Sequence, residues 1–275
     1  MTTMKLYRTR AGAVLETPEG RVLLADDWDT LWCHEDLPAY LASQRSGPVY
    51  RQPLEVLAPV ASQEVWAAGV TYLRSRSARV EESKDAGGGS FYDRVYDAAR
   101  PELFFKAAGW RVRGPGDEVR IRRDAQWSVP EPEIALCINA QGRIVGHTIG
   151  NDMSSRDIEG ENPLYLPQAK TYTGSCALGP AILIGDTLPP TTTIGIRIDR
   201  GSECVFEGST TWSRMRRTPQ ELVEWLYREN SFPKGCVLLT GTGVVPPDAF
   251  TLAAGDAISI DVAAIGTLQN TVAAS

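Results

Sequence analysis

Two glutamates separated by one residue open an apolar stretch near the middle of the chain, "EPEIALCI". Ile134, Leu136 and Ile138 alternate behind them, as expected for a strand whose side chains repeat every second residue. Glu131 and Glu133 therefore lie on one face of that strand, where like charges repel unless a positive group lies between them. A solvated strand end is the commoner explanation of such a pair, so the pair alone leaves the choice open.

A third carboxylate, Asp152, follows another apolar run in "GNDMSSRD", a turn-like stretch of Gly, Asn and Ser. With Glu131 and Glu133 it makes an all-oxygen ligand set, which favours Mg²⁺, Mn²⁺ or Ca²⁺ over zinc. We assign His147, five residues before Asp152, to packing. The polar segment 154–180 is expected to be a long irregular loop, and such loops inside compact domains are usually functional.

Other segments carry side chains suited to proton transfer or ligand binding. Glu102 and Lys106 open and close an apolar stretch, "ELFFKA", and burial would raise the pKa of such a glutamate and suit it for proton abstraction. Lys170 lies in the polar segment, and Thr242 lies among glycines in "LLTGTGVV", where hydroxyl and backbone N–H groups could hold a carboxylate. A solvated side chain or a plain turn is the competing interpretation of each.

The elements that must position these groups are mostly strands. Residues 1–60 predict a small N-terminal α/β domain, and residues 61–275 a catalytic domain. One amphipathic helix, "TPQELVEWLYREN", interrupts the strands of the second domain, with Thr218 as its N-cap. A polar stretch around 74–98 is expected to be a mobile lid. The predicted fold class is α+β and β-rich, with a large mixed sheet.

Charge and composition argue against several classes of function. There are 28 Lys and Arg residues and 34 Asp and Glu residues, and the net charge of −6 argues against nucleic acid or an anionic membrane as partner. No apolar run approaches the roughly 20 residues of a membrane span, and the N-terminus lacks the apolar core of a signal peptide. Five scattered cysteines without a CxxC motif are typical of reduced thiols, so we expect a cytoplasmic protein.

Taken in order, these motifs resemble the fumarylacetoacetate hydrolase family over about residues 64–270. The resemblance rests on "GVTYLRS", "PELFFKA", "GPGDEV", "EPEIAL", "GNDMSSRD", Lys170, "LGPAI" and "TGTGVV". It implies the mixed β-roll fold of that family, association into a homodimer or homotetramer, and a divalent metal, Mg²⁺ or Mn²⁺. The metal ligands that it implies are Glu131, Glu133 and Asp152.

The same resemblance implies which side chains meet the substrate. Arg156, Lys170 and Thr242 match the ligand pocket of the family, and Lys106 and Arg74 are further candidates for substrate binding.

One departure from the family pattern narrows the expected reaction. Hydrolytic members carry G-x-N-Y-x-x-H near the start of the domain, with the His as general base on water, whereas here Thr71 replaces the Asn and Ser75 stands in place of the His. The unbroken "EGENPLYLPQAK" is instead similar to the branch that dehydrates 2-keto-3-deoxy-D-arabinonate. This implies a metal-dependent hydro-lyase that acts on a 2-keto-3-deoxy sugar acid and forms 2,5-dioxopentanoate. For that reaction we expect Glu102 to be the principal base and Lys170 to be an acid or polarising group near the departing hydroxyl.

Two alternatives remain at the level of sequence. The first alternative is a different metal-dependent reaction of the family on a 2-keto acid. This would be hydrolysis of an acylpyruvate or diketo acid, oxaloacetate-type decarboxylation, or isomerisation. The second alternative is a non-catalytic protein that binds a sugar acid or has a structural role. The joint presence of three carboxylates and Lys170 argues against it.

Overall fold

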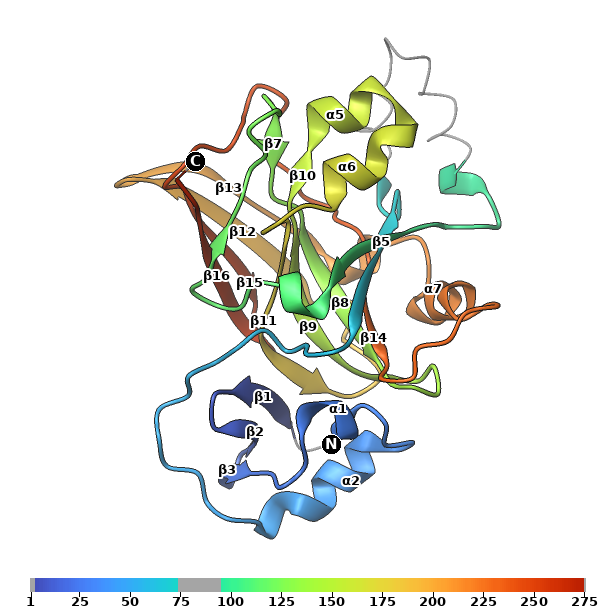
Figure 1. Ribbon diagram of the computed structural model, residues 1–275, viewed down its shortest axis with the longest axis vertical. Helices are drawn as coiled ribbons and strands as arrows, with labels where there is room; N and C mark the ends of the chain where they lie inside the picture. The colour runs from blue at the N-terminus through green and yellow to red at the C-terminus, as the bar shows by residue number, and fades with distance from the viewer. Residues whose placement is uncertain (1–2, 74–94, 275) are drawn as a thin grey trace.

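The computed structural model describes residues 3–73 and 95–274 of the 275-residue chain, and its strands form two main sheets (Figure 1). The larger sheet has nine strands in the order β3-β2-β1-β11-β9-β8-β14-β4-β5. Its strands are β1 (Lys5–Thr9), β2 (Gly12–Thr17), β3 (Gly20–Leu23), β4 (Glu64–Gly69), β5 (Glu102–Ala108), β8 (Pro132–Ile138), β9 (Ile144–Asp152), β11 (Cys176–Ile184) and β14 (Cys236–Leu239).

The smaller sheet has five strands in the order β13-β12-β15-β16-β6. Its strands are β6 (Glu118–Val119), β12 (Thr193–Arg200), β13 (Glu203–Thr211), β15 (Ala257–Val262) and β16 (Gly266–Val272). A separate pair joins β7 (Ser128–Val129) and β10 (Ser154–Ser155). The described helices are α1 (Trp28–Leu31), α2 (Leu37–Ser43), α5 (Arg156–Glu161), α6 (Leu166–Lys170) and α7 (Pro219–Leu226), with 3₁₀ turns η1 (Gln44–Ser46), η2 (Gly109–Arg111), η3 (Pro163–Tyr165) and η4 (Trp212–Arg214). This confirms the predicted α+β, β-rich class.

Strand β8 is buried on both faces, which explains its nearly continuous apolar sequence. Ile134, Leu136 and their neighbours pack in a cluster shared with β12, β15 and β16, so this face looks into the space between the two sheets. Ala135 and Cys137 point the other way, into a second cluster that includes side chains of α1 and α2. Since side chains alternate along a strand, Glu133 belongs to the second face.

The N-terminal strands extend the larger sheet. β1 pairs with β11 in antiparallel fashion, placing Lys5 opposite Leu183 and Leu6 opposite Ile182. Leu6 also lies in the apolar cluster that covers the second face of β8. The lower, blue part of Figure 1 is this N-terminal segment. The division into domains near residue 60 stays a prediction.

Two helical predictions have different outcomes. The amphipathic helix is present as α7, and the hydroxyl of Thr218 accepts a hydrogen bond from the backbone N–H of Glu221 at 3.2 Å, as its N-cap role requires. The expectation of an irregular loop over 154–180 is wrong for most of the segment, because β10, α5, η3 and α6 follow one another as far as Lys170 and β11 begins at Cys176. Pro residues in the first turns of η3 and α6 are compatible with a helix start, and the packing of α6 against β5 and β10 stabilises the short helices that replace the loop. Most of the predicted lid at 74–98 lies outside the described residues, as does Arg74.

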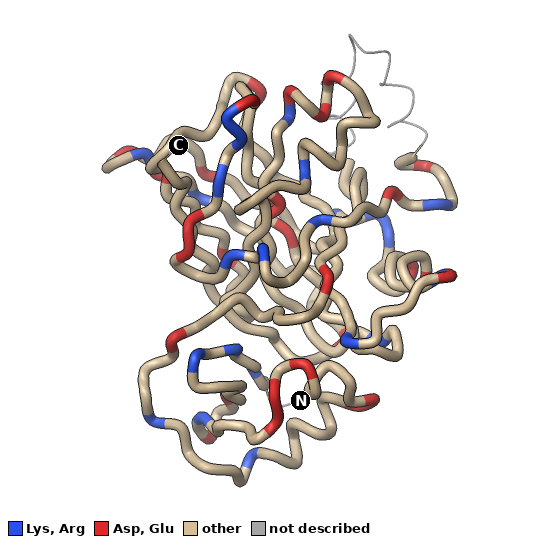
Figure 2. The backbone as a smooth tube through the Cα atoms, viewed as in Figure 1, with Lys and Arg blue, Asp and Glu red and all other residues tan. Residues whose placement is uncertain are grey.

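Within residues 3–73 and 95–274, no helix is long and apolar enough to cross a membrane. Lys and Arg positions are scattered along the backbone and interspersed with Asp and Glu (Figure 2).

Candidate active site

Three buried carboxylates meet at one end of the larger sheet. Glu131 directly precedes β8, Glu133 lies within it, and Asp152 is the last residue of β9. The antiparallel pairing of β8 with β9 sets Glu133 opposite Gly150, and the backbone N–H of Asp152 donates to the carbonyl of Glu131 at 2.9 Å. One ligand oxygen from each carboxylate lies within 4.8 Å of the other two. The structure therefore brings together the three residues that the sequence singles out.

Lysine and arginine side chains surround two of these carboxylates. The ammonium group of Lys170 lies 2.6 Å from Glu131 Oε2 and 3.2 Å from Asp152 Oδ2. Arg156 Nη2 lies 2.6 Å from Glu131 Oε1, and Lys106 Nζ lies 2.5 Å from Asp152 Oδ1. Because all five side chains are buried, these are ion pairs with little solvent screening.

Glu133 differs from the other two carboxylates. Its Oε2 accepts the backbone N–H of Gly241 at 2.6 Å, and no Lys or Arg of the described residues forms an ion pair with it. Burial raises the pKa of Glu133 well above its usual value, and the charges of Asp152 and Glu131 raise it further. This carboxylate lies where one more positive charge would be strongly stabilising.

Asp152 is shifted in the opposite direction. Burial alone would raise its pKa, but the ammonium groups of Lys106 and Lys170 outweigh burial and hold the pKa below its ordinary value. Asp152 is thus kept ionised, which suits a metal ligand.

A β-bulge directs Lys106 into this cluster. On β5, Phe105 pairs with Trp66 and Ala107 pairs with Val65, which leaves Lys106 as the extra residue between two consecutive partners. Its ammonium group also donates to the carbonyls of Met153 (2.9 Å) and Lys170 (2.5 Å). With Asp152 these acceptors use all three of its hydrogens. Lys106 therefore ties β5 to the ends of β9 and α6.

The two short helices place the other cations. Arg156 begins α5 and Lys170 ends α6, and both helices lie beside the β7–β10 pair in Figure 1. Lys170 Nζ also donates to the hydroxyl of Ser154 at 2.6 Å and lies 5.8 Å from the centre of the Phe104 ring. The segment predicted as a loop thus places both of its candidate cationic side chains, Arg156 and Lys170, next to the carboxylates.

A small cavity opens onto the carboxylates. It is lined by Ala68, Gly69, Val70, Phe104, Glu131, Glu133, Asp152, Lys170, Gly241 and Thr242. Thr242 lies in its wall, but its hydroxyl donates to the carbonyl of Val244 at 2.9 Å. Glu102 lies just behind the wall, because its carboxylate packs against Gly69, the residue opposite it on β4.

Several residues around the site have no functional signature in the sequence. Ser154, Phe104 and the backbone N–H of Gly241 contact the charged groups, but a serine, a phenylalanine and a glycine are each ordinary in such segments. Gly69 and Gly241 could have been noticed, since "GVTY" and "TGTG" place glycines where the backbone must come close to other atoms. A Cβ atom on Gly69 would lie 2.0 Å from Glu102 Oε2.

His147 lies outside this cluster, as its assignment to packing requires. Its ring is edge-on to Trp212, with centroids 6.5 Å apart, on the side of β9 that faces the smaller sheet. Burial lowers the pKa of His147 from 6.5 to about 4.

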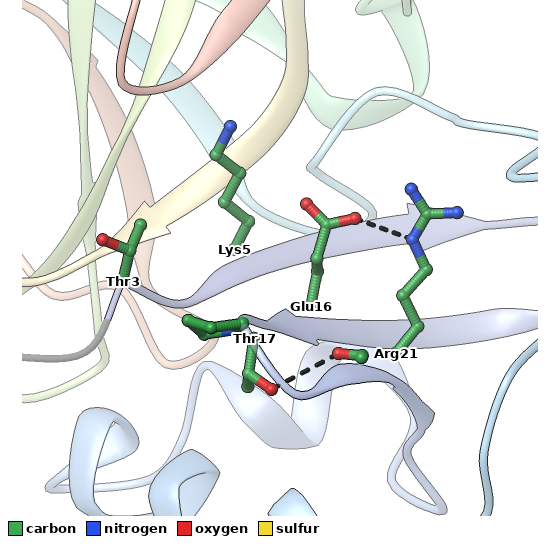
Figure 3. A pocket seen from close by; sticks show the side chains of 7 residues that line it. Thr3, Lys5, Glu16, Thr17 and Arg21 are labelled. Atoms are coloured by element: carbon green, nitrogen blue, oxygen red, sulfur yellow. Dashed lines mark hydrogen bonds and ion pairs between the residues drawn. The ribbon is translucent and has the colours of Figure 1, made fainter.

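A second hollow lies on the N-terminal strands, apart from the carboxylates (Figure 3). Glu16 pairs with Arg21 at 2.7 Å across it, and Lys5 donates to the carbonyl of Ile265 at 3.0 Å. These charged groups therefore bond to one another or to the backbone, and the described residues that line the hollow include no cluster of catalytic groups.

Comparison with known proteins identifies the family of this chain. Residues 65–273 match the family model described as fumarylacetoacetate (FAA) hydrolase, C-terminal. A relative from Haloferax volcanii, named as a probable 2-keto-3-deoxyxylonate dehydratase, is 46% identical over 216 residues, which cover 78% of this chain and 73% of the relative. A relative from Saccharolobus solfataricus, named as 2-dehydro-3-deoxy-D-arabinonate dehydratase, is 41% identical over 218 residues, with the same coverage of 78% and 73%.

The fold is also similar to that of a solved structure. The chain is similar to 2-keto-3-deoxy-D-arabinonate dehydratase complexed with magnesium and 2,5-dioxopentanoate, with a TM-score of 0.82 and 32% identity over 99% of both chains.

Proposed function

The chain belongs to the fumarylacetoacetate hydrolase family, and we propose that within it the protein is a metal-dependent dehydratase of 2-keto-3-deoxypentonates. The substrate, such as 2-dehydro-3-deoxy-D-arabinonate, would lose water and give 2,5-dioxopentanoate. One observation carries the proposal: a buried cluster of three carboxylates opens onto a small cavity and is flanked by an acidic and a basic side chain. The two dehydratases named among its relatives support the choice of reaction.

The side chains present fit a divalent metal. Glu131, Glu133 and Asp152 offer only oxygen atoms, the preferred ligands of Mg²⁺ and Mn²⁺. Burial and the neighbouring charges of Asp152 and Glu131 raise the pKa of Glu133 although Lys170 acts against them, so a bound cation would stabilise the ionised form of this carboxylate. When bound there, the metal would act as a Lewis acid that polarises the keto group of the substrate.

Two residues are proposed for proton transfer. Glu102 would take a proton from C3 of the substrate, and Lys170 would give a proton to the departing C4 hydroxyl, so that one water molecule leaves. A later transfer of a proton from C5 back to C3 gives an enol between C4 and C5. Loss of the enol hydroxyl proton and protonation of C4 then produce the second carbonyl group. The packing of Glu102 against the cavity wall at Gly69 and the position of Lys170 in the cavity support these roles.

The remaining candidates would bind and orient the substrate. We propose that Thr242 holds its carboxylate and that Arg156 orients Glu131, to which it is bonded. Arg74 is kept as a candidate for substrate binding. Lys106 would act mainly through Asp152 and Lys170, because all three of its ammonium hydrogens already have protein acceptors.

A panel of 2-keto acids tests the reaction. Purified protein with Mg²⁺ is incubated with 2-keto-3-deoxypentonates of each configuration, oxaloacetate and an acylpyruvate, and products are identified by mass spectrometry. We expect 2,5-dioxopentanoate only from a 2-keto-3-deoxypentonate, and no product after chelation of the metal. Cleavage of the acylpyruvate, or a change in oxaloacetate alone, would overturn the dehydratase proposal.

We further propose that the protein acts in the cytoplasm as a homodimer or homotetramer. Its five cysteines are free thiols, which supports a reducing compartment. Light scattering coupled to gel filtration would measure the oligomer size, and a monomeric mass would contradict the proposal.

A further inference from the structure

Strand β4 ends at Gly69, and residues 69–71 lie between the proposed base Glu102 and the turn that contacts Glu133. Gly69 makes room for the carboxylate of Glu102, and Val70 lines the cavity. Val70 has φ = 53°, a left-handed conformation that a β-branched residue rarely adopts. Such conformations persist only where surrounding contacts enforce them, and they gather at functional sites.

Thr71 supplies one of those contacts. It is fully buried, and its hydroxyl donates to the carbonyl of Thr240 at 2.6 Å. Its own carbonyl accepts the backbone N–H of Arg216 at 2.9 Å, so both sides of the residue are anchored. In the sequence, Thr71 is distinctive only as a departure from the hydrolytic motif.

The Thr240–Gly241 turn in turn reaches the carboxylate cluster. The carbonyl of Thr240 and the N–H of Gly241 belong to the same peptide unit, so a bond to that carbonyl helps to fix the direction of the N–H. This N–H donates to Glu133 Oε2 at 2.6 Å. On the other side, the N–H and hydroxyl of Thr240 both donate to the carbonyl of Ile134, at 3.1 and 2.7 Å.

The fit between Thr71 and the turn is close. A Cβ atom on Gly241 would lie 2.0 Å from the hydroxyl oxygen of Thr71, and Gly241 has φ = 92°. The turn therefore depends on glycine for both space and backbone conformation, and the Thr71 hydroxyl occupies the space that the missing side chain leaves.

We propose that Thr71 is a positioning residue for Glu133: its hydroxyl holds the 240–241 peptide so that the Gly241 N–H binds one carboxylate oxygen and directs the other toward the metal. The inference rests on the proposed metal centre and deepens it. Outer contacts of this kind typically change metal affinity by about 10–100-fold when they are removed.

Binding of Mg²⁺ alone tests the proposal, measured by isothermal titration calorimetry on the full-length protein. Thr71→Val keeps the shape of the side chain and removes the hydroxyl, whereas Thr71→Ser keeps the hydroxyl. Thr148→Val is a matched control, because Thr148 is also fully buried and its hydroxyl donates to a backbone carbonyl, that of Gly179 at 3.3 Å.

We expect Thr71→Val to weaken Mg²⁺ binding at least about 10-fold, while Thr71→Ser and Thr148→Val stay within about 3-fold of the unmodified protein. Saturating Mg²⁺ should restore most of the turnover of Thr71→Val. If Thr71→Val does not fold, Thr71→Ala replaces it, with its affinity compared with that of Thr71→Ser.

The outcomes separate this proposal from the proposed reaction. Equal Mg²⁺ affinity in Thr71→Val and Thr71→Ser, or equal loss in Thr148→Val, overturns the positioning role. Absence of Mg²⁺ binding by the unmodified protein overturns both the metal centre and this inference. Weakened binding in Thr71→Val alone, with no dehydration of any 2-keto acid by the unmodified protein, supports the positioning role and overturns only the reaction.

Discussion

Glu133 and Glu102 are both acidic, yet their surroundings suit them to different tasks. Glu133 is buried in the cluster, where it accepts the backbone N–H of Gly241 and forms no ion pair with a Lys or Arg of the described residues. Glu102 is less buried and lies beside the cavity, on the same strand as Phe104 and Lys106. A ligand needs a permanent charge close to the metal, whereas a base must release and regain a proton near the substrate.

Substitution of each glutamate separates the two tasks. We expect Glu102→Gln to reduce turnover by about 10²–10⁴-fold, the usual contribution of a general base, with Mg²⁺ affinity unchanged. Glu133→Gln should lose both turnover and Mg²⁺ binding. Steady-state kinetics and calorimetry measure the two quantities, and wild-type turnover in Glu102→Gln would show that another group is the base.

At the scale of the element, the pairing of β4 with β5 decides where Glu102 lies. Gly69 faces Glu102 across this pair, and any side chain there would collide with the carboxylate. The bulge at Lys106, four residues further along β5, sends that ammonium group toward Asp152. The same strand thus contributes to both the proposed base and the ion pairs.

Gly69→Ala tests the contribution of this pair. A displacement of about 1 Å at a catalytic group can cost about 10²-fold in rate, so we expect a loss of that order in kcat, with Mg²⁺ affinity preserved. The matched control is Gly195→Ala on β12, where a Cβ atom would meet its nearest neighbour at 3.8 Å. Equal activity of the two variants would contradict the role given to Gly69.

Strand β9 gives the fold a pH dependence that is separate from catalysis. Burial lowers the pKa of His147 to about 4, so between about pH 4 and 6.5 the unfolded chain holds more protons than the folded one at this residue. The free energy of unfolding then rises with pH across that window, by up to about 3 kcal/mol from this group.

Urea unfolding of the unmodified protein and His147→Gln between pH 4 and 7.5 checks this expectation. The variant should lack that part of the rise, and the difference between the two curves removes the contribution of carboxylates common to both. Parallel curves would show that His147 does not titrate in this way.

At the scale of the whole molecule, the carboxylate cluster joins segments that are distant in the chain. Glu131 and Glu133, Asp152, and the glycine turn at Gly241 come together only when β8, β9 and β14 are assembled. A ligand that binds the folded state alone stabilises it by RT ln(1 + [L]/Kd), about 2.7 kcal/mol at 100 times Kd.

Mg²⁺ should therefore raise the melting temperature of the protein, and a chelator should reverse the shift. The variant Glu133→Gln provides the control, since it removes one ligand of the proposed centre. A calorimetric scan with the same shift in both proteins would indicate that Mg²⁺ acts elsewhere on the molecule.

The sequence by itself was sufficient for the β-rich class, the family and the three carboxylates. Period-two alternation after Glu133 depends only on local backbone geometry, and the family motifs preserve their order along the chain. The capped helix α7 was predictable for the same reason, because Thr218 and Glu221 are three residues apart. The structure of segment 154–180 was less predictable from sequence. Its helices are too short to form by their own propensity, and α6 is stabilised by packing against β5 and β10.

Only the tertiary structure decided which groups surround each carboxylate. Lys106 is 46 residues from Asp152, Lys170 is 39 residues from Glu131, and Gly241 is 108 residues from Glu133, and no local pattern encodes such contacts. A bulge, a strained valine and a turn that requires glycine set them within hydrogen-bond distance. The negative charges of Glu131 and Glu133 are thus compensated in different ways. Two cations already neutralise Glu131, while Glu133 depends on one N–H and, in the proposed function, on a metal.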